Sequence, residues 1–236
     1  MEEKYPVLIS IYITNYNYGK YIEQAVNSVL QQSLQDFEII IIDDGSTDNS
    51  PEIIRTLAEH PKIKTIFQKN KGLNVTNNIA LRVARGKYIM RLDADDFLDT
   101  HALLVMSNML EKDPELGLVF PNYYLTDADG RVDSVHQRHD FSEVSLMDQA
   151  AHGACTMIRT KFIKELGGYS ENYQCQDGYE LWVKFTAKYQ VANVPTPLFY
   201  YRQHGSNLTK NEGRILSTRA SINQEYVQHR KAREYS

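Results

Sequence analysis

The amino-acid sequence predicts an α/β protein: one open, mostly parallel twisted sheet flanked by helices, with a mixed second half. Strand-like and helix-like segments alternate over the first hundred residues, which is typical of a parallel sheet covered by helices. The run 37–42 is apolar except for Glu38, as expected for a parallel strand that is buried on both faces. In the second half, Asp127-Ala128-Asp129-Gly130 is a turn sequence between two strand-like segments, which indicates an antiparallel hairpin.

The first half supplies the parallel strands and the helices that connect them. The helices are predicted from apolar residues three or four positions apart, and Pro51 occupies a first-turn position that proline tolerates. We expect strands at 7–13, 37–42, 63–67 and 87–92, and helices at 21–30, from residue 50, and at 73–84.

The second half mixes shorter elements. Gly167-Gly168 is typical of a helix end, and Pro195 and Pro197 indicate interruptions of a strand. We expect strands at 118–126, 132–135, 153–159, 191–194 and 198–201, a loop at 136–145, and helices at 160–166, at 177–188 and from residue 215.

Composition limits the class of protein. The 236 residues are 42% hydrophobic and 24% charged, as in soluble globular proteins. The net charge of −4 gives no reason to expect a nucleic-acid partner. The apolar runs are strand-sized, the first residues lack an apolar signal region, and the two cysteines are read as a reduced pair. We therefore expect a cytoplasmic protein.

Polar, turn-rich sequences follow three of the predicted parallel strands. Ligands of open α/β sheets bind beyond the carboxyl ends of the strands, so these segments would share one crevice. Taken singly, each could instead be a turn that caps the next helix. The three segments are Thr14-Asn15-Tyr16-Asn17, Asp43-Asp44-Gly45-Ser46 and Asp93-Ala94-Asp95-Asp96.

Asp93, Asp95 and Asp96 put three carboxylates into four residues. Without neutralisation they would repel one another and raise each other's pKa. A hard divalent cation removes this cost, because carboxylate oxygens are preferred ligands of Mg²⁺ and Mn²⁺. The motif therefore indicates a divalent metal site.

Residues 7–97 closely resemble the family-two inverting glycosyltransferases, which have the GT-A fold. The likeness continues more loosely to about residue 207. The matching segments are Thr14-Asn15-Tyr16-Asn17, Ser28-Val29-Leu30-Gln31-Gln32-Ser33, Asp36-Phe37-Glu38, Asp43-Asp44-Gly45-Ser46-Thr47-Asp48, Asn70-Lys71-Gly72-Leu73, Leu92-Asp93-Ala94-Asp95-Asp96, Leu166-Gly167-Gly168-Tyr169, Gln176-Asp177-Gly178-Tyr179-Glu180-Leu181-Trp182 and Tyr200-Tyr201-Arg202-Gln203-His204.

This resemblance implies a donor site. Asp44 would accept a hydrogen bond from the nucleobase, Asp93 would lie near the ribose, and Asp95 and His204 would bind Mn²⁺ or Mg²⁺. Asp177 matches the general base, which takes the proton of the acceptor hydroxyl during a single in-line displacement. The residues implied to bind the nucleotide-sugar are Thr14, Tyr16, Asp44, Lys71, Asn78, Arg91, Asp93 and Ala94.

The sequence departs from the family pattern at two positions. Gln176 stands where relatives often have Glu, which removes a like charge beside Asp177. Asn77 stands where relatives often have Arg, so Lys71 and Arg91 are the candidates to supply a cation near the phosphates.

The resemblance implies a glycosyltransferase that moves a sugar from a nucleotide-sugar, with a UDP-sugar as the expected donor, to a growing surface glycan or a lipid-linked acceptor. It also implies one domain, with a nucleotide-sugar half (1–97), an acceptor-side half (98–207) and a helical extension (208–236). The basic end of that extension is read as a solvated helix face that would also permit peripheral contact with anionic lipid. One alternative is a degenerate glycan-binding scaffold. Another is a sugar nucleotidyltransferase, although the first loop lacks the glycine-rich, arginine-containing sequence of that class.

Overall fold

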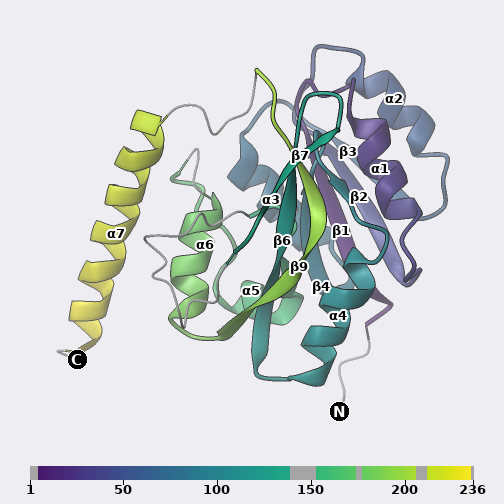
Figure 1. The fold of residues 1–236 in the computed structure, drawn as a ribbon. Coiled ribbons are helices and arrows are strands. Elements are labelled where there is room, and N and C mark those ends of the chain that lie inside the picture. Colours follow the sequence, from purple (N-terminus) through teal and green to yellow (C-terminus); the bar gives the residue numbers. More distant parts are fainter. Residues whose placement is uncertain (1–4, 139–152, 174–176, 206–211, 235–236) are drawn as a thin grey trace.

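The computed structural model describes residues 5–138, 153–173, 177–205 and 212–234. These residues form one nine-stranded sheet in the order β3-β2-β1-β4-β8-β6-β9-β5, with β7 paired to β6 (Figure 1). The strands are β1 (Val7–Asn15), β2 (Phe37–Asp43), β3 (Ile63–Phe67), β4 (Gly86–Asp93), β5 (Phe97–Leu98), β6 (Leu116–Thr126), β7 (Val132–His136), β8 (Met157–Arg159) and β9 (Gln190–Arg202).

The parallel part of the sheet confirms the prediction. Strands β3, β2, β1 and β4 are parallel neighbours. Beyond β4 the sheet becomes mixed, because β8 runs antiparallel to both β4 and β6, while β6 and β9 are parallel. The expected α/β fold with a mixed second half is therefore the observed one.

Helices cover both faces of this sheet (Figure 1). Side chains that alternate along the strands point to opposite faces, so Ile39 and Ile41 pack with α1, α2 and α4, whereas Ile40 and Ile42 pack with α3, α5 and α6. All seven residues of β2 are buried, as predicted for this strand. The helices are α1 (Ile22–Leu30), α2 (Ser50–Leu57), α3 (Leu73–Val83), α4 (Ala102–Lys112), α5 (Thr160–Glu165), α6 (Asp177–Thr186) and α7 (Glu212–Glu234).

Three elements differ from the sequence-based expectation. Strand β9 is continuous where two short strands were expected. Val194 pairs with Pro121 and Pro197 pairs with Asn122, so residues 195–196 form an irregularity that accommodates the prolines. Strand β8 is shorter than expected, because Cys155 has a φ of 50°, which interrupts an extended chain. Strand β5 and helix α4 were not predicted, and most of the expected loop 136–145 lies outside the described residues.

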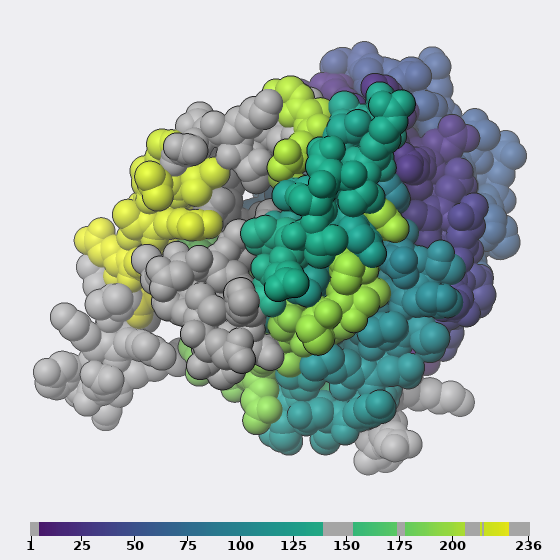
Figure 2. All heavy atoms as spheres, in the orientation of Figure 1, coloured from purple at the N-terminus to yellow at the C-terminus, as the bar shows by residue number. Residues whose placement is uncertain are grey.

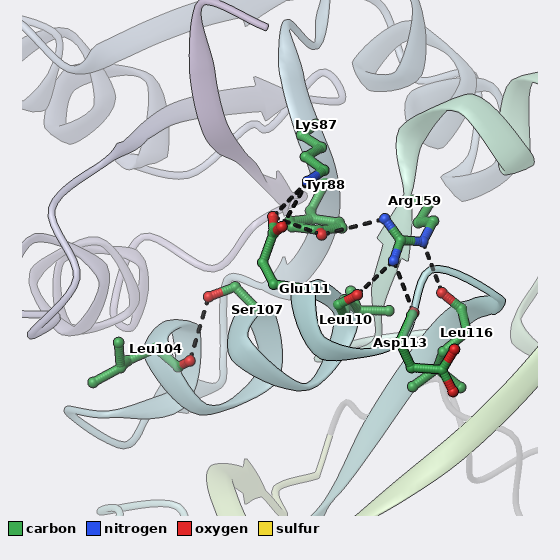
Figure 3. Close-up of polar contacts among 9 residues, drawn as sticks. All are labelled: Lys87, Tyr88, Leu104, Ser107, Leu110, Glu111, Asp113, Leu116 and Arg159. Carbon is green, nitrogen blue, oxygen red and sulfur yellow. Dashed lines mark hydrogen bonds and ion pairs between the residues drawn. The ribbon is translucent and has the colours of Figure 1, made fainter. Parts of the chain in front are cut away.

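Arg159 ties α4 to the sheet (Figure 3). Its guanidinium donates hydrogen bonds to the carbonyl oxygens of Leu110 (2.5 Å) and Asp113 (3.0 Å) at the end of α4, and to that of Leu116 (2.8 Å). The same guanidinium donates to the hydroxyl of Tyr88, 3.3 Å away. These bonds satisfy carbonyl groups that the end of a helix leaves without intrahelical partners.

The surface carries β7 and α7. Strand β7, in teal, lies on the face shown in Figure 2, and all five of its residues are exposed. Helix α7 stands beside α6, on the side away from α1 and α2 (Figure 1). Within the described ranges, no helix combines the length and the apolar character needed to cross a membrane.

Candidate functional site

The carboxyl ends of β1, β2 and β4 meet at one edge of the sheet, as predicted. Thr14 is in register with Asp93 of β4, and Asn15 is in register with Asp43 of β2. The three polar segments that follow these strands therefore adjoin one another. This edge is where ligands bind in open α/β sheets.

Hydrogen bonds lock the loops after β1 and β2 together. The Asn15 amide donates to Asp43 Oδ1 (2.8 Å) and to Ser46 Oγ (3.0 Å). The backbone N–H of Asn17 also donates to Ser46 Oγ (2.8 Å), and the N–H of Thr47 donates to Asn17 Oδ1 (2.7 Å). Asp43 and Asn15 thus give this edge a fixed shape.

Asp44 organises the start of α3. Its Oδ1 accepts hydrogen bonds from the Gln68 amide (2.7 Å) and the backbone N–H of Lys71 (2.8 Å), and its Oδ2 accepts one from the N–H of Gly72 (2.9 Å). The turn requires glycine at Gly45, where φ is 81° and an added Cβ would lie 2.7 Å from a backbone nitrogen. The Asp44 carboxylate, in a residue only 7% exposed, is therefore held rigidly.

Asp93 is held from two sides. Thr14 Oγ1 donates a hydrogen bond to Asp93 Oδ1 (3.1 Å), and Nε of Arg91 lies 2.9 Å from the same oxygen. The Asp93 side chain keeps 27% of its surface exposed, whereas that of Arg91 keeps 6%. Ala94, the next residue, donates its N–H to the Thr14 carbonyl (3.2 Å), and its methyl group is buried.

Asp95 faces His204. Nε2 of His204 lies 2.9 Å from Asp95 Oδ2, and both side chains are almost fully buried. The Tyr21 ring stacks on the imidazole with centroids 5.3 Å apart, and Tyr18 meets it edge-on at 5.6 Å. Burial and the charges of Asp95, Asp93 and Asp96 raise the pKa of Tyr18 above its usual range, so this hydroxyl stays protonated at neutral pH.

Asp96 lies beneath the site. Burial, reinforced by the charges of Asp95 and Asp93, raises the pKa of Asp96 well above its usual range. Only the contribution of those two charges is the repulsion expected from the sequence. Arg202 offsets part of it, because its backbone N–H donates to Asp96 Oδ1 (2.9 Å). The Arg202 guanidinium also donates to the carbonyls of Asp95 (2.7 Å) and Ala128 (2.9 Å).

The remaining residues predicted from the sequence lie at the end of β1, around α3 and at the start of α6. Tyr16 is 47% exposed at the end of β1, and Lys71 is exposed before α3. The amide of Asn78 exchanges two hydrogen bonds with the backbone of Tyr169, each 2.9 Å long, so it holds that loop, and its binding of the nucleotide-sugar stays a prediction. Asp177 is the first residue of α6; its side chain and Gln176 lie outside what the structure describes.

Three further residues contact the Asp95–His204 pair and had no role among the sequence-based predictions: Tyr18, Tyr21 and Arg202. The two tyrosines lie in the loop and turn between β1 and α1, and they pack on His204. Arg202 lies two residues before His204 and is 2% exposed. The one sequence feature that could have indicated its role is its position in the family-like segment 200–204.

The donor atoms fit a divalent cation bound jointly by protein and phosphate. Over the described ranges, no group of three His, Cys, Asp or Glu residues is close enough to hold a metal alone. Asp95 and His204 instead present one carboxylate and one imidazole at a 2.9 Å separation. Mg²⁺-type sites often use one or two carboxylates and complete their shell with substrate phosphates.

Comparisons with known proteins find related sequences. A family model described as "Glycosyl transferase family 2" matches residues 10–168. Chondroitin synthase of Escherichia coli is 42% identical over 202 residues, which cover 85% of this chain and 29% of that protein. The chain thus spans less than a third of the length of this relative.

TarS and PcManGT are among the solved structures that resemble the fold. S. aureus TarS 1–349 in complex with UDP-GlcNAc has a TM-score of 0.72 at 19% identity, covering 85% of this chain and 60% of the TarS chain. The mannosyltransferase PcManGT from Pyrobaculum calidifontis, in complex with GDP-Man and Mn²⁺, has a TM-score of 0.65 at 18% identity, with coverage of 85% and 60%. At these identities the likeness supports the GT-A fold.

Proposed function

The chain belongs to glycosyltransferase family 2, and on this premise we propose that it moves a sugar, with inversion, from a nucleotide-sugar to a hydroxyl of a glycan or lipid-linked acceptor. The observation that carries the proposal is the pairing of Asp95 with His204 at the strand edge that also holds Asp44 and Asp93. We propose a UDP-sugar as the donor, with hexose or N-acetylhexosamine as the transferred group.

Asp44 and the end of β1 would bind the nucleoside. A carboxylate offers about four acceptor positions, and three of those on Asp44 are used by N–H groups of the chain. The fourth, on Oδ2, suits a nucleobase N–H. Exposed Tyr16 and Thr14 would lie beside base and ribose, with Asp93 next to the ribose.

Asp95 and His204 would hold Mn²⁺ or Mg²⁺. Such an ion supplies positive charge to the diphosphate as it leaves. Arg91 is already paired with Asp93, so its charge is largely balanced within the protein. Lys71, exposed at the start of α3, is the cation that we assign to the phosphates, in place of the family arginine that Asn77 replaces.

Asp177 would act as the general base. It begins α6, and the positive end of the helix dipole favours its ionised form. The acceptor oxygen attacks the anomeric carbon while its proton passes to the Asp177 carboxylate. The bond from that carbon to the diphosphate oxygen breaks, and the nucleoside diphosphate leaves with the electron pair.

Incubation with Mn²⁺ and a panel of UDP-hexoses, UDP-N-acetylhexosamines, UDP-hexuronate and GDP-mannose tests the proposal. We expect one donor to be consumed, with Asp95→Asn impaired in nucleotide binding and Asp177→Asn impaired only in turnover. If neither UDP nor any of these donors binds detectably, the proposal is wrong. Equal inactivity of wild type and Asp177→Asn, with retained glycan binding, would instead support the scaffold alternative.

A further inference from the structure

Helix α7 packs against α6, the helix that begins with Asp177 (Figure 1). Exposure along its described part alternates with helical spacing. The face turned inward is polar apart from two isoleucines, and Ile222 alone of these side chains is fully buried. The inward residues are Ile215, Thr218, Arg219, Ile222, Asn223 and Tyr226.

Tyrosine side chains make the specific contacts between the two helices. The hydroxyl of Tyr226 in α7 donates a hydrogen bond to Glu180 Oε1 (2.9 Å), and that of Tyr179 in α6 donates to Asn223 Oδ1 (2.9 Å). The Arg219 guanidinium lies over the Tyr179 ring at 5.0 Å. In the described part of α7, Ile222 is the one fully buried apolar side chain, so these polar contacts would set the register of α7 on α6.

Glu180 is the centre of this contact. Its residue is only 1% exposed, and its Oε1 also pairs with Lys184 Nζ at 2.5 Å. Lys184 in turn donates to the carbonyl of Gly168 (3.0 Å). Removal of the Tyr226 hydroxyl would leave this buried carboxylate with one donor fewer, so the contact that holds α7 on α6 would weaken.

On its other side α6 is fixed by the core. Leu181, Trp182 and Phe185 are fully buried, and the Trp182 ring meets Phe120 edge-on with centroids 4.6 Å apart. The helix is therefore clamped between the sheet and α7. Asp177 lies three positions before Glu180, so the clamp also fixes the backbone that carries Asp177.

We propose that Tyr226 and Glu180 are positioning residues for the Asp177 base, acting through the α6–α7 contact. This inference rests on the proposed function, since it takes Asp177 as the base. A misplacement of about 1 Å in a catalytic group can lower turnover up to about a hundredfold. Donor binding, which we assign to the ends of β1, β2 and β4, would not depend on this clamp.

The test compares Tyr226→Phe and Glu180→Gln with Tyr189→Phe. Tyr189 is the matched control, because its hydroxyl donates to exposed Glu165 of α5 (2.5 Å) rather than to α7. Each variant is measured for UDP affinity in Mn²⁺, for kcat and KM with the donor found above, and for its urea unfolding midpoint. If Tyr226→Phe does not fold, Tyr179→Phe removes the neighbouring interhelical bond instead.

We expect Tyr226→Phe and Glu180→Gln to lower kcat by about tenfold, with the Kd for UDP within about twofold and Tyr189→Phe like wild type. A Tyr226→Phe protein with wild-type kcat, or with UDP affinity reduced as much as kcat, overturns the inference. Failure of the proposed function looks different: wild type consumes no donor, or Asp177→Asn is fully active.

Discussion

Nε2 of His204 lies 2.9 Å from Oδ2 of Asp95, although 109 positions separate the two residues in the sequence. The contact forms because β9 pairs with β5, with Tyr200 opposite Phe97, which returns the chain to the acidic motif. Tyr21 and Tyr18 then pack on the imidazole. A ring held in this way loses little further freedom when it binds a ligand, so the pair is preorganised.

We expect His204→Ala to weaken Mn²⁺ binding, measured by titration in the presence of saturating UDP, by at least about tenfold, which corresponds to about 1.4 kcal/mol. His101→Ala is the control, since His101 lies on the surface before α4 and hydrogen-bonds Ser33. Unchanged Mn²⁺ affinity in His204→Ala would remove the imidazole from the metal site.

Asp44→Asn is expected to lower both stability and nucleotide affinity. The amide that replaces one oxygen would face an N–H donor, so about 1–3 kcal/mol of unfolding free energy would be lost. Urea unfolding and UDP titration measure the two effects separately. Asp129→Asn, at an exposed turn position, should change neither. Full stability combined with weaker UDP binding would contradict the structural role of Asp44 at the start of α3.

Much of the fold could be predicted from the sequence. The parallel strands were recognisable because β-branched runs such as 39–42 end in polar turns. The continuity of β9 could not be predicted, because the strand accommodates Pro195 and Pro197 only through its irregular register with β6. Helix α4 was not predicted, although Leu103, Met106 and Leu110 have helical spacing and Asp99 accepts a hydrogen bond from the N–H of His101 (2.9 Å) just before the helix.

The position of a site residue could be predicted only where that residue directly follows a predicted strand. Asp93 and Asp95 follow their strand directly, so their place at the sheet edge could be derived. The packing of Tyr21 on His204 and the bonds from Arg202 to Asp95 and Asp96 depend on the antiparallel β5–β9 pairing. No spacing in the sequence encodes that pairing.

Arg159→Met should destabilise the protein without touching the donor site. It would remove the guanidinium that donates to the carbonyl groups of Leu110, Asp113 and Leu116 (Figure 3), at a cost of about 2–3 kcal/mol. The Asp113 carbonyl would keep the Leu116 N–H as a donor, at 3.2 Å. Thermal or urea unfolding measures the loss, and UDP affinity is expected to be unchanged. Arg131→Ala is the comparison, because the Arg131 side chain is 80% exposed and such a change costs less than about 0.5 kcal/mol. Equal stability of the two variants would refute the assigned role.

The buried carboxylate of Glu38 makes the free energy of unfolding depend on pH. Burial alone would raise its pKa, but hydrogen bonds from Arg85, Ser10 and Lys64 outweigh burial and lower the pKa from 4.5 to about 2. The side chain is 3% exposed, so solvent screens these contacts little. In the unfolded chain the contacts are absent, so the unfolded state binds a proton more readily than the folded state below about pH 4.5.

The contribution of Glu38 is therefore complete above about pH 4.5 and is lost as the pH falls toward 2. A shift of this size corresponds to about 3 kcal/mol. We expect Glu38→Gln to be less stable than wild type at pH 7, and the difference in unfolding free energy to shrink steadily as urea titrations are repeated down to about pH 2.5. Glu115→Gln, at an exposed position, should follow wild type throughout. A Glu38→Gln difference that stays constant over this range would mean that packing, rather than the charge of Glu38, holds β1, β2 and β3 together at this point.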